Sequence, residues 1–107
     1  MPEFAANLSW MYAELPPDAR FEAAARDGFT GIEILSPYAW PVAELKSLLS
    51  AHGLSLVLIN APPAGTDKAS IEQAWATGQK GISCLPGREA EFKAGMALAL
   101  AYAHALS

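Results

Sequence analysis

The sequence predicts an α/β fold in which parallel strands alternate with covering helices. Three short apolar segments, residues 4–9, 31–35 and 54–59, each run into polar residues. Residues 54–59 are almost entirely Leu, Val and Ile, which is typical of a parallel strand buried on both faces. Gly53 precedes this segment and the Pro62-Pro63 pair follows it, and both are strong strand boundaries. The chain is therefore interpreted as a repeated strand–loop–helix unit.

The first two helices are predicted from their boundary residues. Proline suits the first helical turn, so one helix is expected after Pro16-Pro17 and another from Pro41. Glycine suits the left-handed position that ends a helix, so Gly28 and Gly53 are expected to close them. Apolar residues spaced by three and four positions support both helices.

The second half of the chain is less regular. Residues 61–85 contain prolines and glycines, and a short helix over 70–76 is expected there with Ser70 as its cap. A last helix is expected from Pro86 or Glu89 to Leu106. The residues predicted to form its apolar face are Phe92, Met96, Leu100 and Ala103.

Composition bounds the class of protein. With 107 residues, 52% of them hydrophobic and 17% charged, the chain is long enough for one folded domain. It lacks the roughly 20-residue apolar run of a membrane helix and the basic start of a signal peptide. The single cysteine, Cys84, predicts a reducing cytoplasm, and the net charge of −4 without a basic cluster argues against nucleic acid.

The number of repeats predicts only part of a closed barrel. A TIM barrel has eight strand–helix units in roughly 250 residues, whereas this chain holds about three. We expect residues 1–107 to be the N-terminal (βα)3 portion of a single TIM (β/α)8 barrel domain, with the remainder absent. Three parallel strands leave two open sheet edges, so a homo-oligomer or another partner that pairs with these edges is the alternative.

The predicted site lies at the carboxyl ends of the strands, where parallel α/β folds bind ligands. Polar residues in or at the ends of the three strands are Asn7, Glu33 and Asn60. The loops that follow contain Trp10, Trp40 and Trp75. Aromatic walls with a few amide and carboxylate groups suit a small polyhydroxylated ligand. The alternative is that these aromatic rings pack down on the rim of the barrel.

Glu33 is the most informative single residue, because a carboxylate between Ile32 and Ile34 is costly to bury without a partner. Three explanations stay open: it binds a ligand, it orients a metal ligand from another strand, or it pairs with a buried Arg or Lys. Asn7 and Asn60 can equally cap their own loops through hydrogen bonds from side chain to backbone.

Other motifs are weaker. Residues 81–85 do not form a nucleophile elbow, because leucine stands where the final glycine is needed. Arg88 at a helix start can bind an anion, although an exposed arginine with no ligand explains it as well. The chain has no Cys/His cluster and no metal-binding pair of histidines, so no complete metal site is predicted.

Three segments together resemble a known family. They are Phe4-Ala-Ala-Asn-Leu-Ser9, Gly31-Ile-Glu33 with Pro37-Tyr38, and Leu85-Pro-Gly-Arg-Glu-Ala-Glu-Phe92. These residues and their spacing resemble the start of the hydroxypyruvate isomerase family, which belongs to the xylose-isomerase-like TIM barrels. The resemblance implies an enzyme that interconverts a small hydroxy-aldehyde acid and its ketone, with related members acting on 2-oxo-tetronates. In the wider superfamily carboxylates and a histidine or glutamine hold a divalent metal, and two glutamates move the proton.

Those glutamates and metal ligands come from later strands in the family, and no residue here matches them. The resemblance therefore implies a divalent metal in the full-length protein but none bound by this chain alone. No catalytic residue is assigned, and the 107-residue chain is expected to show no turnover by itself. What this segment supplies is one wall of a sugar-acid pocket, formed by Asn7, Glu33, Tyr38, Asn60 and Arg88.

Two other functions remain open at this stage. One is a non-catalytic α/β module that assembles through its exposed sheet edges. The other is the endonuclease branch of the same barrel superfamily, against which the missing basic patch argues.

Overall fold

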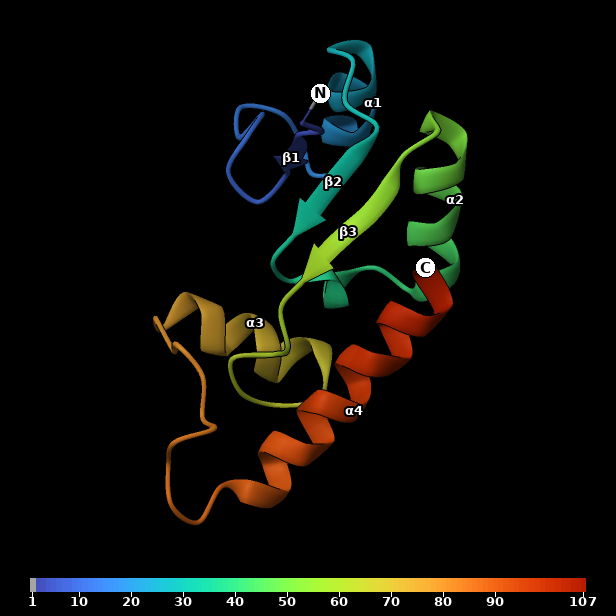
Figure 1. Cartoon of the computed structure of the whole chain (residues 1–107). Coiled ribbons are helices and arrows are strands. Elements are labelled where there is room, and N and C mark those ends of the chain that lie inside the picture. The colour runs from blue at the N-terminus through green and yellow to red at the C-terminus, as the bar shows by residue number, and fades with distance from the viewer. Residues whose placement is uncertain (1) are drawn as a thin grey trace.

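The computed structural model describes residues 2–107, and its elements follow the predicted strand–helix alternation (Figure 1). In chain order they are β1 Ala5–Asn7, α1 Ala19–Arg26, β2 Gly31–Ile34, the 3-10 turn η1 Pro37–Ala39, α2 Val42–His52, β3 Ser55–Ile59, α3 Lys68–Ala76 and α4 Glu89–Leu106. The predicted positions of the strands and helices are confirmed. Within the described residues, no helix is long and apolar enough to cross a membrane.

The three strands form one parallel sheet in the order β1-β2-β3. A parallel neighbour requires the chain to return to the starting end of the sheet, and α1 and α2 make these two crossings. Gly53 ends α2 in the left-handed conformation, with φ of 62°, as its position after the last helical residue predicts. The α/β fold class is therefore confirmed.

The core lies between one face of the sheet and the helices. Side chains alternate along a strand, so every second residue of β1 and β2 points to the helices. The buried residues of this layer are Ala6, Leu8, Phe21, Ala24, Ile32, Ile34, Leu45, Leu49 and Leu54. Asn7 and Glu33 occupy the intervening positions, so they lie on the opposite face of the sheet. The same alternation therefore separates the core from the polar residues.

The expectation that residues 54–59 are covered on both faces is wrong. In β3, Val57 is 58% exposed and Leu58 is 43% exposed. Leu58 pairs with Glu33 of β2 and so shares the sheet face opposite the core, and β3 also stands at the edge of the described sheet. Its unbroken apolar sequence is thus that of a central strand, although it occupies an edge here.

The second half of the chain lies beyond the carboxyl ends of β2 and β3 (Figure 1). There, α3 contacts η1, while α4 contacts both α2 and β3. Figure 1 shows α4 running diagonally from the far loop to a C-terminal end beside α2. The long helix therefore ties the loops at this end of the sheet back to the α/β core.

The cap predicted for α3 is wrong by three residues. Asp67 is the N-cap, and its side chain accepts a hydrogen bond from the Ser70 amide at 3.0 Å. Ser70 takes the third helical position and its hydroxyl completes the capping box. Both residue types are good caps, so an aspartate three positions earlier moves the helix start to Lys68.

The apolar face predicted for α4 is only half correct. Phe92 packs against a buried cluster, but Leu100 is 52% exposed. The buried positions are the small residues Gly95 and Ala99, because the loops that cover this helix approach its backbone closely. Ala99 packs with Tyr38 of η1, which joins α4 to the loop after β2.

Replacing the buried Leu45 should lower the free energy of unfolding far more than replacing the exposed Leu100. Leu45→Ala empties a fully buried position between α2 and the sheet, so the free energy of unfolding should fall by about 2–5 kcal/mol. Leu100→Ala removes an exposed side chain and should change it by less than about 1 kcal/mol. Urea unfolding followed by circular dichroism measures both values. An equal loss in the two variants would contradict the burial assigned to α2 and α4.

Candidate functional site

Two adjoining cavities open at the carboxyl end of the sheet. The smaller, of about 380 Å³, lies over the ends of β1 and β2. The larger, of about 640 Å³, lies between the loop after β3, the loop after α3 and the start of α4. Trp10, Leu35 and Trp75 line both cavities, so the two adjoin along these side chains and are together called the recess. This is the end of the sheet where the sequence places a ligand.

Asn7 and Glu33 meet on the sheet face opposite the helices. Parallel pairing of β1 with β2 makes them direct neighbours, and the Asn7 amide nitrogen donates to Glu33 Oε2 at 3.3 Å. Asn7 Oδ1 accepts from the Ser9 amide at 3.0 Å, so this residue also caps its own loop. No Arg or Lys among residues 2–107 forms an ion pair with Glu33. The ion-pair explanation is therefore wrong for the described part of the chain.

Tyr38 and Asn60 are also joined, through a hydrogen bond to the backbone. The Tyr38 hydroxyl donates to the Asn60 carbonyl, and the ring stands edge-on to Tyr102 with centroids 5.1 Å apart. Burial, with a smaller contribution from Tyr102, raises the pKa of Tyr38 to about 12, so this hydroxyl stays protonated. The Asn60 side chain is exposed and lines the larger cavity. Tyr38 itself lines neither cavity.

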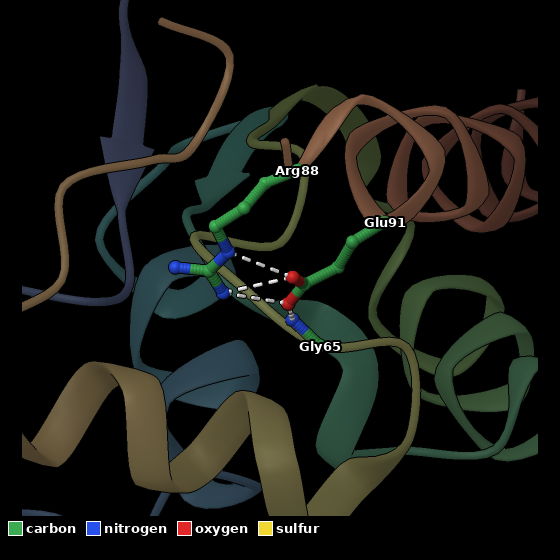
Figure 2. A network of polar contacts seen from close by, with 3 residues as sticks. All are labelled: Gly65, Arg88 and Glu91. Carbon is green, nitrogen blue, oxygen red and sulfur yellow. Dashed lines mark hydrogen bonds and ion pairs between the residues drawn. The ribbon is translucent and has the colours of Figure 1, made fainter. Parts of the chain in front are cut away.

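Arg88 is paired with Glu91 at the start of α4, as Figure 2 shows. Its Nε donates to Glu91 Oε2 and its Nη2 to Glu91 Oε1, both at 2.9 Å. Glu91 Oε1 also accepts from the Gly65 amide at 2.9 Å. The Gly65 amide first, and then Arg88, lower the pKa of Glu91 below its ordinary value. In the described chain no hydrogen bond links Arg88 to the other four predicted residues.

The structure thus divides the five predicted residues into three groups. Asn7 is hydrogen-bonded to Glu33. Tyr38 is hydrogen-bonded to the backbone carbonyl of Asn60. Arg88 forms an ion pair with Glu91. Only Asn60 lines one of the two cavities. Asn7 and Glu33 line neither, and their chain neighbours Leu8 and Ile34, which line the smaller one, belong to the buried core on the other face of the sheet. Their contact with a substrate stays a prediction.

Sequence reasoning missed Arg20, which lines the smaller cavity. Its Nε donates to the Leu15 carbonyl at 3.1 Å and its Nη1 to the Leu8 carbonyl at 2.8 Å. These bonds fasten the loop after β1 to the start of α1. The sequence holds one weak signal for this role. Phe21 is an apolar residue that turns one side of α1 to the core, and Arg20 is the residue next to it.

The three tryptophans differ in their surroundings. Trp40 packs edge-on against Phe21, with centroids 5.9 Å apart, and its indole nitrogen donates to Asp18 at 2.7 Å. It therefore fits the packing explanation. Trp10 is 71% exposed and Trp75 is 39% exposed, so these two present open aromatic surface at the recess.

The described residues do not offer a metal site. Residues 2–107 contain no group of three or more His, Cys, Asp or Glu side chains that could hold an ion. Asn7 and Glu33 together supply one amide oxygen, already bonded to Ser9, and one carboxylate. These donors do not make up the roughly six to eight oxygen ligands of a Ca²⁺ site.

The three parallel strands with their helices are shared with a solved structure of the xylose-isomerase-like TIM-barrel type. A crystal structure of AP endonuclease, family 2 from Brucella melitensis, a TIM-barrel-type protein, superposes with a TM-score of 0.86 at 42% identity. The match covers 99% of this chain and 38% of that one. No family model matches the sequence.

Relatives in sequence carry isomerase names. The 2-oxo-tetronate isomerase of Cupriavidus necator is 48% identical over 103 residues, which are 96% of this chain and 36% of that protein. The 2-oxo-tetronate isomerase of Haemophilus influenzae and the hydroxypyruvate isomerase of Escherichia coli are 47% and 45% identical over 106 residues. Each of these two matches covers 99% of this chain and 38% of the relative. The resemblance to the hydroxypyruvate isomerase family is thereby confirmed over nearly the whole chain.

Acid should release the Glu91 pair in a defined pH range. The pKa of Glu91 is lower in the folded chain than its ordinary value of 4.5. Ionised Glu91 therefore stabilises the fold fully above pH 4.5, and this stabilisation is lost as the pH falls through the pKa of the folded state. The amide signal of Gly65 should therefore titrate with a midpoint below 4.5 in two-dimensional NMR. Arg88→Met should move that midpoint upward, since one of the two groups that stabilise the carboxylate is gone.

Glu89→Gln is the control for this titration. Glu89 also lies in the first turn of α4, but its carboxylate accepts from Gly87 and not from Gly65. The Gly65 midpoint should therefore not change. A Gly65 signal that titrates at 4.5 or above in the unaltered chain would contradict the assigned contact.

Proposed function

We propose that this chain forms one wall of the substrate pocket of an aldose–ketose isomerase that acts on a small hydroxy or oxo sugar acid. The observation that carries the proposal is the 45–48% identity, over 96–99% of the chain, to proteins named hydroxypyruvate or 2-oxo-tetronate isomerase. The chain spans only 36–38% of the length of these relatives. The activity is therefore proposed for the whole protein, to which this segment contributes.

The Asn7–Glu33 pair is suited to bind vicinal oxygen atoms. The Ser9 amide fixes the Asn7 side chain so that its nitrogen faces Glu33 Oε2. Glu33 Oε1 has no protein donor in the described chain and accepts a hydroxyl hydrogen of the sugar acid. The second N–H group of the Asn7 side chain donates to a neighbouring hydroxyl or carbonyl oxygen of the sugar acid. Such charge-assisted hydrogen bonds orient the substrate without breaking any of its bonds.

Isomerisation moves a proton between two adjacent carbon atoms. A base removes the proton beside the carbonyl, and the resulting enediolate is reprotonated on the neighbouring carbon. In our proposal Asn7, Glu33 and Asn60 hold the hydroxyl and carbonyl groups during this step. The base belongs to other strands of the whole enzyme. The open aromatic faces of Trp10 and Trp75 cover the carbon chain of the ligand.

One observation favours a second candidate, a nuclease function. The structural neighbour with a TM-score of 0.86 carries an endonuclease name at 42% identity. Against it, the chain has 11 Asp and Glu residues to 7 Lys and Arg, and such a balance repels a phosphate backbone. The third candidate, a non-catalytic module, relies on the exposed apolar surface of β3.

A hybrid enzyme tests the proposal. This chain should replace the homologous segment of the Escherichia coli hydroxypyruvate isomerase, to which it is 45% identical, with retention of isomerase activity. Glu33→Gln in the hybrid should lower kcat/KM by about 10- to 100-fold, since a charge-assisted hydrogen bond to substrate is lost. Coupled spectrophotometric assay of hydroxypyruvate isomerisation measures the change.

Glu22→Gln is the matched control, because Glu22 is an exposed glutamate on α1 in the same segment. It should leave kcat/KM unchanged. A folded hybrid without isomerase activity would contradict the proposed function, and cleavage of DNA at abasic sites by that hybrid would favour the nuclease. Equal rates for the Glu33 and Glu22 variants would contradict the role given to Glu33.

A further inference from the structure

The loop from Asn60 to Asp67, between β3 and α3, is fixed at its start by the strand next to it. The Asn60 amide donates to the Leu35 carbonyl at 3.2 Å, and the Asn60 carbonyl accepts from the Tyr38 hydroxyl. Pro63 and Ala64 in the middle of the loop are buried. The loop is therefore a packed wall of the larger cavity and not a solvated connection.

The far part of the same loop is fixed by α4. Glu91 Oε1 accepts from the Gly65 amide at 2.9 Å. One turn further along the helix, Gly95 is buried, and a Cβ added there would lie 3.8 Å from both the Gly65 carbonyl oxygen and the Pro62 ring. Gly65 has φ of 79°, and an added Cβ would come within 2.7 Å of the Ser70 Cβ, so only glycine fits.

Arg88 determines where the Glu91 carboxylate points. Two guanidinium nitrogens hold the two carboxylate oxygens, which leaves Oε1 directed at the Gly65 amide (Figure 2). Both side chains are about one-third exposed, at 35% and 33%. A bidentate pair of this kind constrains orientation more than it contributes to stability.

This contact joins two walls of one cavity. The loop contributes Asn60, Pro62 and Pro63 to the lining, and α4 contributes Phe92 and Met96. The bond from Gly65 to Glu91 crosses between these two elements at the side of the cavity. It ties the end of the loop to α4, while the Leu35 and Tyr38 contacts hold the Asn60 end.

We propose that Glu91, oriented by Arg88, is a positioning residue that docks the loop of residues 60–67 on α4 and so fixes Asn60 at the wall of the larger cavity. The proposal rests on the proposed function, in which this cavity receives a sugar acid. It gives Arg88 an indirect role, since its guanidinium acts on the substrate through Glu91, Gly65 and the loop.

NMR of the whole 107-residue chain tests this docking directly. Glu91→Ala should speed hydrogen exchange of the Gly65 amide by about tenfold or more, and should move the signals of the Asn60 side-chain amide and the Trp75 indole. Glu91→Gln keeps an oxygen that can accept from Gly65 and should restore most of the protection. The control is Glu72→Ala, which breaks the exposed pair with Lys68 on α3 and should change none of these signals.

Binding of hydroxypyruvate, followed by the NMR signal of the Trp75 indole N–H, gives the functional readout. Glu91→Ala should raise the dissociation constant by about fivefold or more, with partial recovery in Glu91→Gln and no change in Glu72→Ala. Arg88→Met should resemble Glu91→Ala in this assay, although the Gly65 acceptor is still present.

The outcomes separate the two proposals. If Glu91→Ala leaves the Gly65 exchange and the Asn60 and Trp75 signals as they are in Glu72→Ala, the docking role is wrong. If these signals change but affinity does not, the loop docks without positioning the site, and the proposal is equally wrong. If the unaltered chain fails to bind hydroxypyruvate, the proposed function of this cavity fails, while the exchange and the two signals still decide whether Glu91 docks the loop.

Discussion

The parallel pairing of β1 with β2 is the constraint on which the rest of the structure depends. Its register puts Asn7 directly opposite Glu33, and the alternation of side chains then places Ala6, Leu8, Ile32 and Ile34 on the other face. A shift by one residue would bury the carboxylate among the helices and expose the core residues. The hydrophobic layer and the polar pair thus specify each other.

Loops that follow the strands are fastened by polar side chains reaching back to the backbone. Arg20 holds the carbonyls of Leu8 and Leu15, Ser9 accepts from the Leu35 amide, and Glu91 holds Gly65. Each contact uses a backbone group of the loops that follow the strands, outside the regular strand and helix bonds. The recess is therefore lined by loops that the scaffold holds in place, which is the arrangement that a small-molecule site requires.

Much of this could be predicted from the sequence, because strand and helix patterns are local. Glycine and proline positions gave the helix ends, and polar residues after apolar runs located Asn7, Glu33 and Asn60 at one end of the sheet. The i, i+3 spacing of Arg88 and Glu91 is also a local signal, and it favours the observed ion pair over the anion site predicted for Arg88 at this helix start. Contacts between segments that are distant in the sequence cannot be predicted from such local patterns. Glu91 and Gly65 are 26 residues apart, and only folding brings them together.

Other differences have the same origin. The exposure of Leu58 depends on what covers the sheet face opposite the core, and the burial of Gly95 depends on how closely a loop approaches α4. The residue type does not settle either case, since leucine normally favours the interior, and glycine, although often buried, has no side chain that marks a packing partner. Sequence patterns therefore located the elements and the polar residues, whereas packing decided the contact of Glu91 with Gly65 and the lining of the cavities.

The central claim is that Asn7, Glu33 and Asn60 form a wall that contacts a sugar acid. Titration of hydroxypyruvate into the 15N-labelled chain, followed by the side-chain amide signals of its asparagines, tests it most directly. The account predicts saturable shifts of both the Asn7 and Asn60 signals, with loss of the Asn7 shift in Glu33→Gln. Shifts confined to residues away from the carboxyl end of the sheet, or a shift of Asn7 that survives the Glu33 change, would contradict it.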